Sequence, residues 1–176
     1  IVERYPHAIY ISRYPVGLDA TVYSKGGGGG KDVVFINDTG RPILIHGVCA
    51  RIEEPNALSA VVLNSPSGIT LENFEIVTGG RAGIDIRDAN ATVRGALVRG
   101  NAVRDVRDGI YLNYADEVLV DSNVVERSRY AVHAMFGEGL TLFGNELRAN
   151  LSGLVFMYSA QVLAGRNAIL DARSPG

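Results

Sequence analysis

Three side chains with soft donor atoms lie close together in the repetitive part of the sequence. They are His133, Met135 and Met157. One imidazole nitrogen and two thioether sulfurs form a ligand set that suits Cu(I) better than Zn²⁺, Ca²⁺ or Mg²⁺. The plain alternative is a surface stripe of methionine beside an ordinary histidine. Which interpretation holds depends on whether the fold brings the three side chains together.

A repeat of 22 residues determines where these side chains lie. Asparagine recurs with this period at Asn101, Asn123, Asn145 and Asn167. A fixed period in the twenties is typical of one supersecondary unit stacked on copies of itself. Each unit contains short alternations of apolar and polar residues between Gly, Asn and Asp, without helical spacing. The sequence therefore predicts an all-β fold, in which residues 57–176 form a right-handed parallel β-helix of about five 22-residue coils.

Stacking assigns each strand residue to a column, because side chains alternate between the two faces of a strand. Three inward columns are expected: Ile84, Ile110, Val132 and Leu154; Ile86, Leu112, Ala134 and Phe156; and Val118, Leu140 and Val162. Two outward columns are expected: Asp85, Tyr111, His133 and Val155; and Arg87, Asn113, Met135 and Met157. An aromatic stack is expected beside them: Tyr114, Phe136 and Tyr158.

These columns predict that the soft donors converge. Strands of neighbouring coils are about 4.8 Å apart, so His133, Met135 and Met157 can reach one another. Tyr111 and Asn113, one coil earlier, are expected to supply hydrogen bonds around the ligands. No acidic residue is expected within the patch, so Ca²⁺ and Mg²⁺ should not compete for it.

One coil is longer than the others. Gly83 and Gly109 are 26 residues apart, and the four extra residues are expected as a loop around positions 88–91. Asp108 precedes Gly109 and is expected at a turn.

The N-terminal segment, residues 1–52, lacks the period and is expected to form a small antiparallel β segment before the helix. Its strands include 33–37 and 43–48, and the turn residues at 38–42 predict a hairpin between them. The five glycines at 26–30 are expected as a flexible loop or linker.

Composition limits the function classes. The formal net charge is −2 and the isoelectric point is about 5.9, which does not favour binding to nucleic acid. No apolar run is long enough to span a bilayer. The first residues do not read as a signal peptide. Cys49 is the only cysteine, which excludes an internal disulfide.

The N-terminal segment resembles the VanW family of bacterial cell-envelope proteins. The matching stretches are IVERYPHAIYISRYPVGLDATVY (1–23) and FINDTGRPILI (35–45). The resemblance implies a part of such a domain in the cell envelope, and it carries no catalytic residue onto this chain.

The repetitive part resembles the NosD-type β-helix proteins. The resemblance is carried by RDGI (107–110), RYAVHAM (129–135) and MYS (157–159), and it extends over about 57–170. It implies an exported, periplasmic or cell-envelope protein that works with an ABC-type ATPase and permease in supplying copper to nitrous oxide reductase. Copper donor or acceptor proteins would be its partners. We therefore divide the chain into a partial VanW-like β segment (1–52) and a partial NosD-like β-helix (57–176).

Two other function classes stay open. Parallel β-helices often bind polysaccharides along a lateral groove, either as binding modules or as lyases and glycosidases. Hydrolysis needs two carboxylates at a defined separation. The best pair is Asp116 and Glu138, which share one position on neighbouring coils at a turn, where carboxylates are normally solvated. The sequence therefore favours a protein without catalytic residues. The third class, a cell-envelope binding module, rests on the N-terminal segment.

Overall fold

The computed structural model describes residues 8–12, 23–27, 30–36, 43–54, 58–64, 68–78, 80–100 and 106–172. These residues form strands connected by turns. The strands are β1 (Ala8–Ser12), β2 (Tyr23–Gly27), β3 (Gly30–Ile36), β4 (Ile43–Glu54), β5 (Ser59–Asn64), β6 (Ile69–Thr78), β7 (Ala82–Arg87), β8 (Ala91–Arg94), β9 (Leu97–Gly100), β10 (Val106–Asn113), β11 (Leu119–Asp121), β12 (Val124–Glu126), β13 (Ser128–Met135), β14 (Thr141–Phe143), β15 (Glu146–Arg148), β16 (Ser152–Met157), β17 (Leu163–Gly165) and β18 (Ala168–Leu170).

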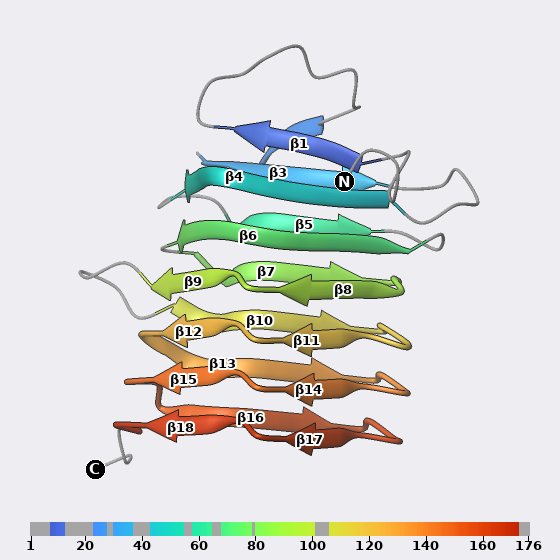
Figure 1. Ribbon diagram of the computed structural model, residues 1–176, viewed down its shortest axis with the longest axis vertical. Coiled ribbons are helices and arrows are strands. Elements are labelled where there is room, and N and C mark those ends of the chain that lie inside the picture. Colours follow the sequence, from blue (N-terminus) through green and yellow to red (C-terminus); the bar gives the residue numbers. More distant parts are fainter. Residues whose placement is uncertain are drawn as a thin grey trace.

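The strands stack as a parallel β-helix that winds in the right-handed sense (Figure 1). From the C-terminal end of the stack to the N-terminal end, one sheet has the order β16-β13-β10-β7-β5-β3-β2. In the other sheet, one edge of the long strand β6 pairs with β4. The opposite edge of β6 pairs with two branches, β8-β11-β14-β17 along its first half and β9-β12-β15-β18 along its second half. The single strand of this coil is thus replaced by two short strands in each later coil. The predicted fold class is confirmed.

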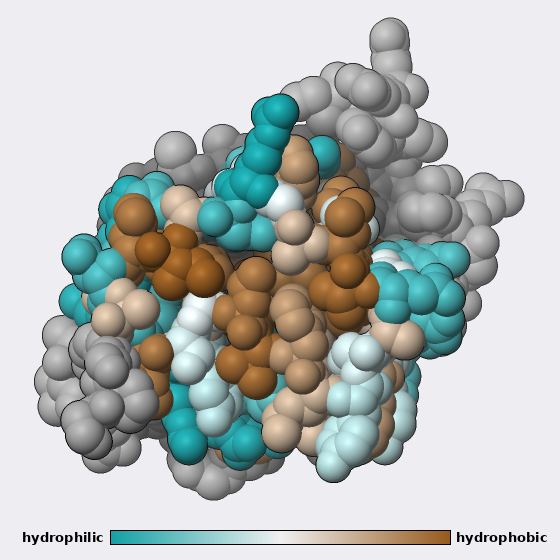
Figure 2. Space-filling view, turned by 90° about the horizontal axis from the view of Figure 1, so that it is seen from below, coloured by the Kyte–Doolittle hydropathy of each residue, from teal (hydrophilic) through white to brown (hydrophobic). Residues whose placement is uncertain are grey.

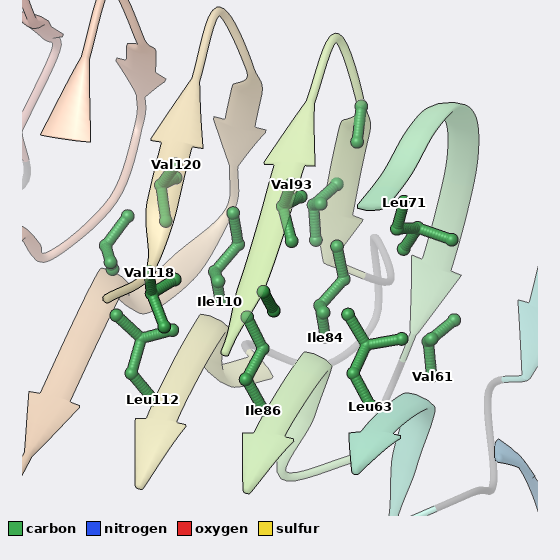
Figure 3. Packing of buried hydrophobic residues seen from close by; sticks show 14 of the residues in the cluster. Val61, Leu63, Leu71, Ile84, Ile86, Val93, Ile110, Leu112, Val118 and Val120 are labelled. Atoms are coloured by element: carbon green, nitrogen blue, oxygen red, sulfur yellow. The ribbon is translucent and has the colours of Figure 1, made fainter. Parts of the chain in front are cut away.

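The predicted inward columns form the core. Ile84, Ile110, Val132 and Leu154 lie in register on β7, β10, β13 and β16, and so do Ile86, Leu112, Ala134 and Phe156. Figure 3 shows Ile84, Ile86, Ile110 and Leu112 in the same cluster as Val93 and Val120 of the opposite sheet. Leu112 is fully buried, whereas Phe156 on the last coil is only partly buried. The apolar columns hold the outward columns of the same strands in fixed register.

The N-terminal strands differ in part from the expectation. The antiparallel segment is present as the pair of β2 and β3. However, β3 also pairs in parallel with β5, and β4 pairs in parallel with β6, so these two strands extend the stack by another coil. The predicted hairpin between 33–37 and 43–48 is wrong, because β3 and β4 belong to different sheets.

The extra residues of the long coil are not where we expected them. Val98 pairs with Val125, and Ile110 pairs with Val132. Twelve positions separate Val98 from Ile110, whereas seven separate Val125 from Val132. The additional length therefore lies between β9 and β10, at residues 101–105, and the corner at 88–91 is not lengthened.

An asparagine ladder runs along one corner of the stack. The backbone N–H of Asn123 donates to Oδ1 of Asn145 at 3.0 Å, and that of Asn145 donates to Oδ1 of Asn167 at 3.0 Å. The side-chain amides of Asn145 and Asn167 donate to carbonyls one coil earlier. Because of the insertion, Ala96 occupies the position before Asn123. Asn101, which we predicted in this line, lies outside the described residues.

The last described coil leaves apolar side chains open. Ile169 is 50% exposed, whereas Leu147, its register partner on the preceding coil, is fully buried. Figure 2 looks onto this end of the stack and shows apolar side chains gathered across it. This end has the shape of a surface on which another coil could stack.

Candidate functional site

The three candidate donors lie on two neighbouring strands. His133 and Met135 lie on β13, and Met157 lies on β16 directly beside Met135 in register. The Nε2 atom of His133 is 3.4 Å from the sulfur of Met157. These two donor atoms are therefore close enough to bind one ion together.

Met135 has a partner of its own. The hydroxyl of Tyr111, on β10, donates a hydrogen bond to the sulfur of Met135 at 3.3 Å. The same hydroxyl lies 3.3 Å from Oδ1 of Asn113. Tyr111 thus contacts a candidate ligand directly, whereas Asn113 reaches it through Tyr111. Burial raises the pKa of Tyr111, so its hydroxyl keeps the proton that it donates.

His133 faces outward and is nevertheless buried. It is 1% exposed. The ring of Tyr130 meets it edge-on with centroids 5.0 Å apart, and the ring of Tyr111 lies 5.1 Å away on a neighbouring strand. Met157 is 44% exposed. In the candidate site, Met157 therefore lies at the surface and His133 lies beneath it.

Asp108 is a member of this site that the sequence did not indicate. It lies within β10 and not at a turn, is 1% exposed, and places Oδ1 3.1 Å from Nδ1 of His133. A side chain at Gly109 would clash with Val125 of the core, so Gly109 faces inward, as Ile110 does. Side chains therefore do not alternate between the two faces of the strand at Gly109 and Ile110, which both face the core. As a result, Asp108 lies on the outward face, with the outward columns.

Burial and nearby positive charges have opposite effects on the pKa of Asp108. Burial raises its pKa, and the nearby His133, Arg107 and Arg81 oppose that rise. Arg107 lies 3.7 Å from the second carboxylate oxygen. Our expectation that no acidic residue lies in the patch is therefore wrong. The acid faces Nδ1, on the side of the imidazole away from Met157.

Asp85, the other buried carboxylate of the outward columns, is paired with two arginines. Asp85 is fully buried, accepts a hydrogen bond from Ser59 at 3.0 Å, and forms ion pairs with Arg81 and Arg87. Within the described ranges, no group of three or more His, Cys, Asp or Glu side chains is placed to hold a metal. A hard-metal site built from such residues therefore finds no support there, and the soft set of one nitrogen and two sulfurs fits Cu(I).

The carboxylates that we considered for catalysis lie elsewhere. Asp116 and Glu138 form a bridge between neighbouring coils and are both exposed. The backbone N–H of Glu138 donates to Asp116 at 3.0 Å, and the amide of Gln161 donates to Glu138 at 2.7 Å. The two acids line a groove of about 730 Å³ together with Asp88, Ala89, Asn90, Tyr114, Glu117, Gly139 and Gln161.

The predicted aromatic stack borders this groove. Tyr114 and Phe136 stack with centroids 4.9 Å apart, and Phe136 and Tyr158 stack at 5.1 Å. Asp88 takes the equivalent position one coil earlier, because its neighbour Arg87 pairs with Asn113. The face of Tyr114 toward that coil therefore has no aromatic neighbour in the stack.

Comparison with known proteins places the chain. A family model described as periplasmic copper-binding protein (NosD) matches residues 56–176, and a model described as VanW like protein matches residues 1–54. No curated protein and no solved structure matches the chain. Across the described residues, we find no helix with the length and apolar character needed to cross a membrane. The NosD match covers more than half of the chain and includes His133, Met135 and Met157. The chain therefore belongs to the periplasmic copper-binding protein (NosD) family.

Proposed function

We propose that this protein is an extracytoplasmic β-helix scaffold that binds Cu(I) at His133, Met135 and Met157. The observation that carries the proposal is the 3.4 Å approach of His133 Nε2 to the sulfur of Met157, inside a chain of the NosD family. Thioethers and a neutral imidazole are soft ligands that favour Cu(I).

The three ligands would bind in two stages. Nε2 of His133 and the sulfur of Met157 already face each other. The sulfur of Met135 accepts a hydrogen bond from Tyr111, and this bond would compete with the ion for the sulfur. All three ligands are uncharged, so they would hold Cu(I) less tightly than thiolates do. Moderate binding suits transfer of copper better than storage.

The partly exposed side chain of Met157 indicates the route of exchange. Because Met157 is 44% exposed and His133 is 1% exposed, an ion would meet Met157 first and leave by it. A donor or acceptor protein would dock against this face. The NosD resemblance adds an ABC-type ATPase and permease as partners, and nitrous oxide reductase as the destination of the copper.

The test is an anaerobic titration with Cu(I) against a competing chelator. Wild-type protein is expected to take up one ion, and Met135→Leu/Met157→Leu is expected to lose measurable binding. Phe143→Leu is a matched control, because Phe143 is an exposed apolar side chain on another sheet. Unchanged binding in the double variant would overturn the proposal.

The groove beside Tyr114 supports a second candidate, the binding of an uncharged saccharide. It combines the ring of Tyr114 with carboxylates and amides that can bind hydroxyl groups, and none of the described residues that line it is basic. Binding of neutral oligosaccharides that Tyr114→Ala abolishes would support this candidate. Cleavage that Asp116→Asn or Glu138→Gln abolishes would make the protein a lyase or glycosidase. The absence of binding to a panel of neutral glycans would remove both.

A further inference from the structure

Asp108 is the side chain that fixes the orientation of His133. Its Oδ1 lies 3.1 Å from Nδ1 of the imidazole, and both side chains are almost completely buried, at 1% and 2% exposure. A carboxylate only accepts hydrogen bonds, so Nδ1 must carry the proton that joins them. The other nitrogen, Nε2, then faces the sulfur of Met157.

The imidazole is also held in its plane. The ring of Tyr130 meets it edge-on at 5.0 Å, with 64° between the ring planes, and the ring of Tyr111 lies at 5.1 Å and 46°. A flip of the ring, which would put Cδ2 in the place of Nδ1, would have to displace these rings. It would also leave Asp108 without its imidazole partner. The orientation therefore depends on contacts that exist before any ion arrives.

We infer that Asp108 is a positioning residue, which keeps the proton of neutral His133 on Nδ1 and so presents Nε2 as the free ligand beside Met157. A metal-bound histidine is commonly oriented in this way by a hydrogen bond from its other ring nitrogen. The link to copper rests on the proposed function, but the position of the proton does not.

The test is nitrogen-15 NMR of the imidazole rings in the metal-free protein, at a pH above the ordinary pKa of histidine. The chain has three histidines, and His133→Gln assigns the signal. Wild-type His133 is expected to be protonated at Nδ1. Asp108→Leu keeps the shape of the side chain and removes both oxygens, and it is expected to move the proton to Nε2. A wild-type ring protonated at Nε2 would overturn the inference whether or not the leucine variant folds.

A control and a copper titration separate the two proposals. Asp85→Asn alters another buried carboxylate, one whose partners are Ser59, Arg81 and Arg87, and it should leave the proton of His133 on Nδ1. Asp108→Leu is expected to weaken Cu(I) binding about 10- to 100-fold. Protonation at Nδ1 in a wild-type protein that binds no copper would refute the proposed function and leave the role of Asp108 standing. If the Asp108→Leu variant bound Cu(I) as tightly as the wild type does, the role of Asp108 in positioning His133 for the metal would be refuted.

Discussion

The backbone N–H of Ala96 donates a hydrogen bond to Oδ1 of Asn123 at 2.9 Å. Asn123 and Asn145 make the same bond to the next asparagine of the ladder. A coil at the start of the ladder thus needs no asparagine, because it uses only its backbone. The ladder can begin at any small residue, provided that the next coil supplies the amide.

Asn145 is the central described rung, and its loss should be costly. Its side-chain oxygen accepts bonds from the backbone and the amide of Asn123, and its own amide donates to Val120 and Asn167. We expect Asn145→Ala to lower the free energy of unfolding by at least about 2 kcal/mol, because buried partners stay unpaired. Urea titration measures this loss. Asn90→Ala, at an exposed position, is the control, and equal losses would contradict the role of the ladder.

The core should be most sensitive in the middle of the stack. Leu112→Ala removes a fully buried side chain and is expected to cost about 2–5 kcal/mol. Phe156→Ala, in the same column on the last coil, is expected to cost less, because Phe156 is only partly buried. Thr141→Ala, on an outward position, should cost least. A larger loss for Phe156 than for Leu112 would mean that the last coil is better covered than the structure shows.

Gly109 is required by the space around it. An added methyl group would clash with Val125 and would lie 2.7 Å from the carbonyl oxygen of Ala131. We expect Gly109→Ala to destabilise the protein by about 1–3 kcal/mol through overpacking. At Gly165 the nearest atoms belong to the exposed ring of Phe143, at 3.2 Å, and can move. Thermal unfolding of both variants checks this difference, and a stable Gly109→Ala protein would contradict the inward orientation.

Glu72 should contribute to acid sensitivity. Burial raises its pKa, but hydrogen bonds from His46 and Arg94 outweigh burial and hold the pKa below the ordinary 4.5. The unfolded chain therefore binds this proton first as pH falls. The contribution is complete above about pH 4.5 and is lost below it. Unfolding of wild type and Glu72→Gln across this range should give curves that converge at low pH. Curves separated by a constant amount would contradict the prediction.

Tyr111 should oppose copper binding. Its hydroxyl donates a hydrogen bond to the sulfur of Met135, and we expect this bond to compete with the ion for the sulfur. A hydrogen bond of this kind contributes about 0.5–1.5 kcal/mol, so Tyr111→Phe should raise the Cu(I) affinity about 2- to 10-fold. The chelator competition measures the change. Weaker binding in Tyr111→Phe would mean that the hydroxyl supports the loaded site instead.

The sequence predicted the columns because the period survives wherever the coils have equal length. The outward placement of Met135 and Met157 followed from strand alternation alone. Asp108 was missed because alternation breaks where Gly109 and Ile110 both face the core. The burial of His133 was also missed, since it depends on the orientation of the Tyr130 and Tyr111 rings.

The asparagine period itself was misleading at one point. Asn101 precedes Asn123 by 22 residues, but the register-equivalent residue, Ala96, precedes it by 27. The insertion at 101–105 happens to carry an asparagine at the spacing of a normal coil. Only strand pairing separates such a coincidence from a true rung.

The asparagine ladder also suggests an order in which the coils fold. Each asparagine reaches back to a carbonyl of the preceding coil and accepts that coil's N–H. A coil is therefore finished only by the one that follows it in the sequence. If the chain emerges N-terminus first into the compartment where it folds, each newly emerged repeat would secure its predecessor, and the coils would fold in order from the N-terminal end.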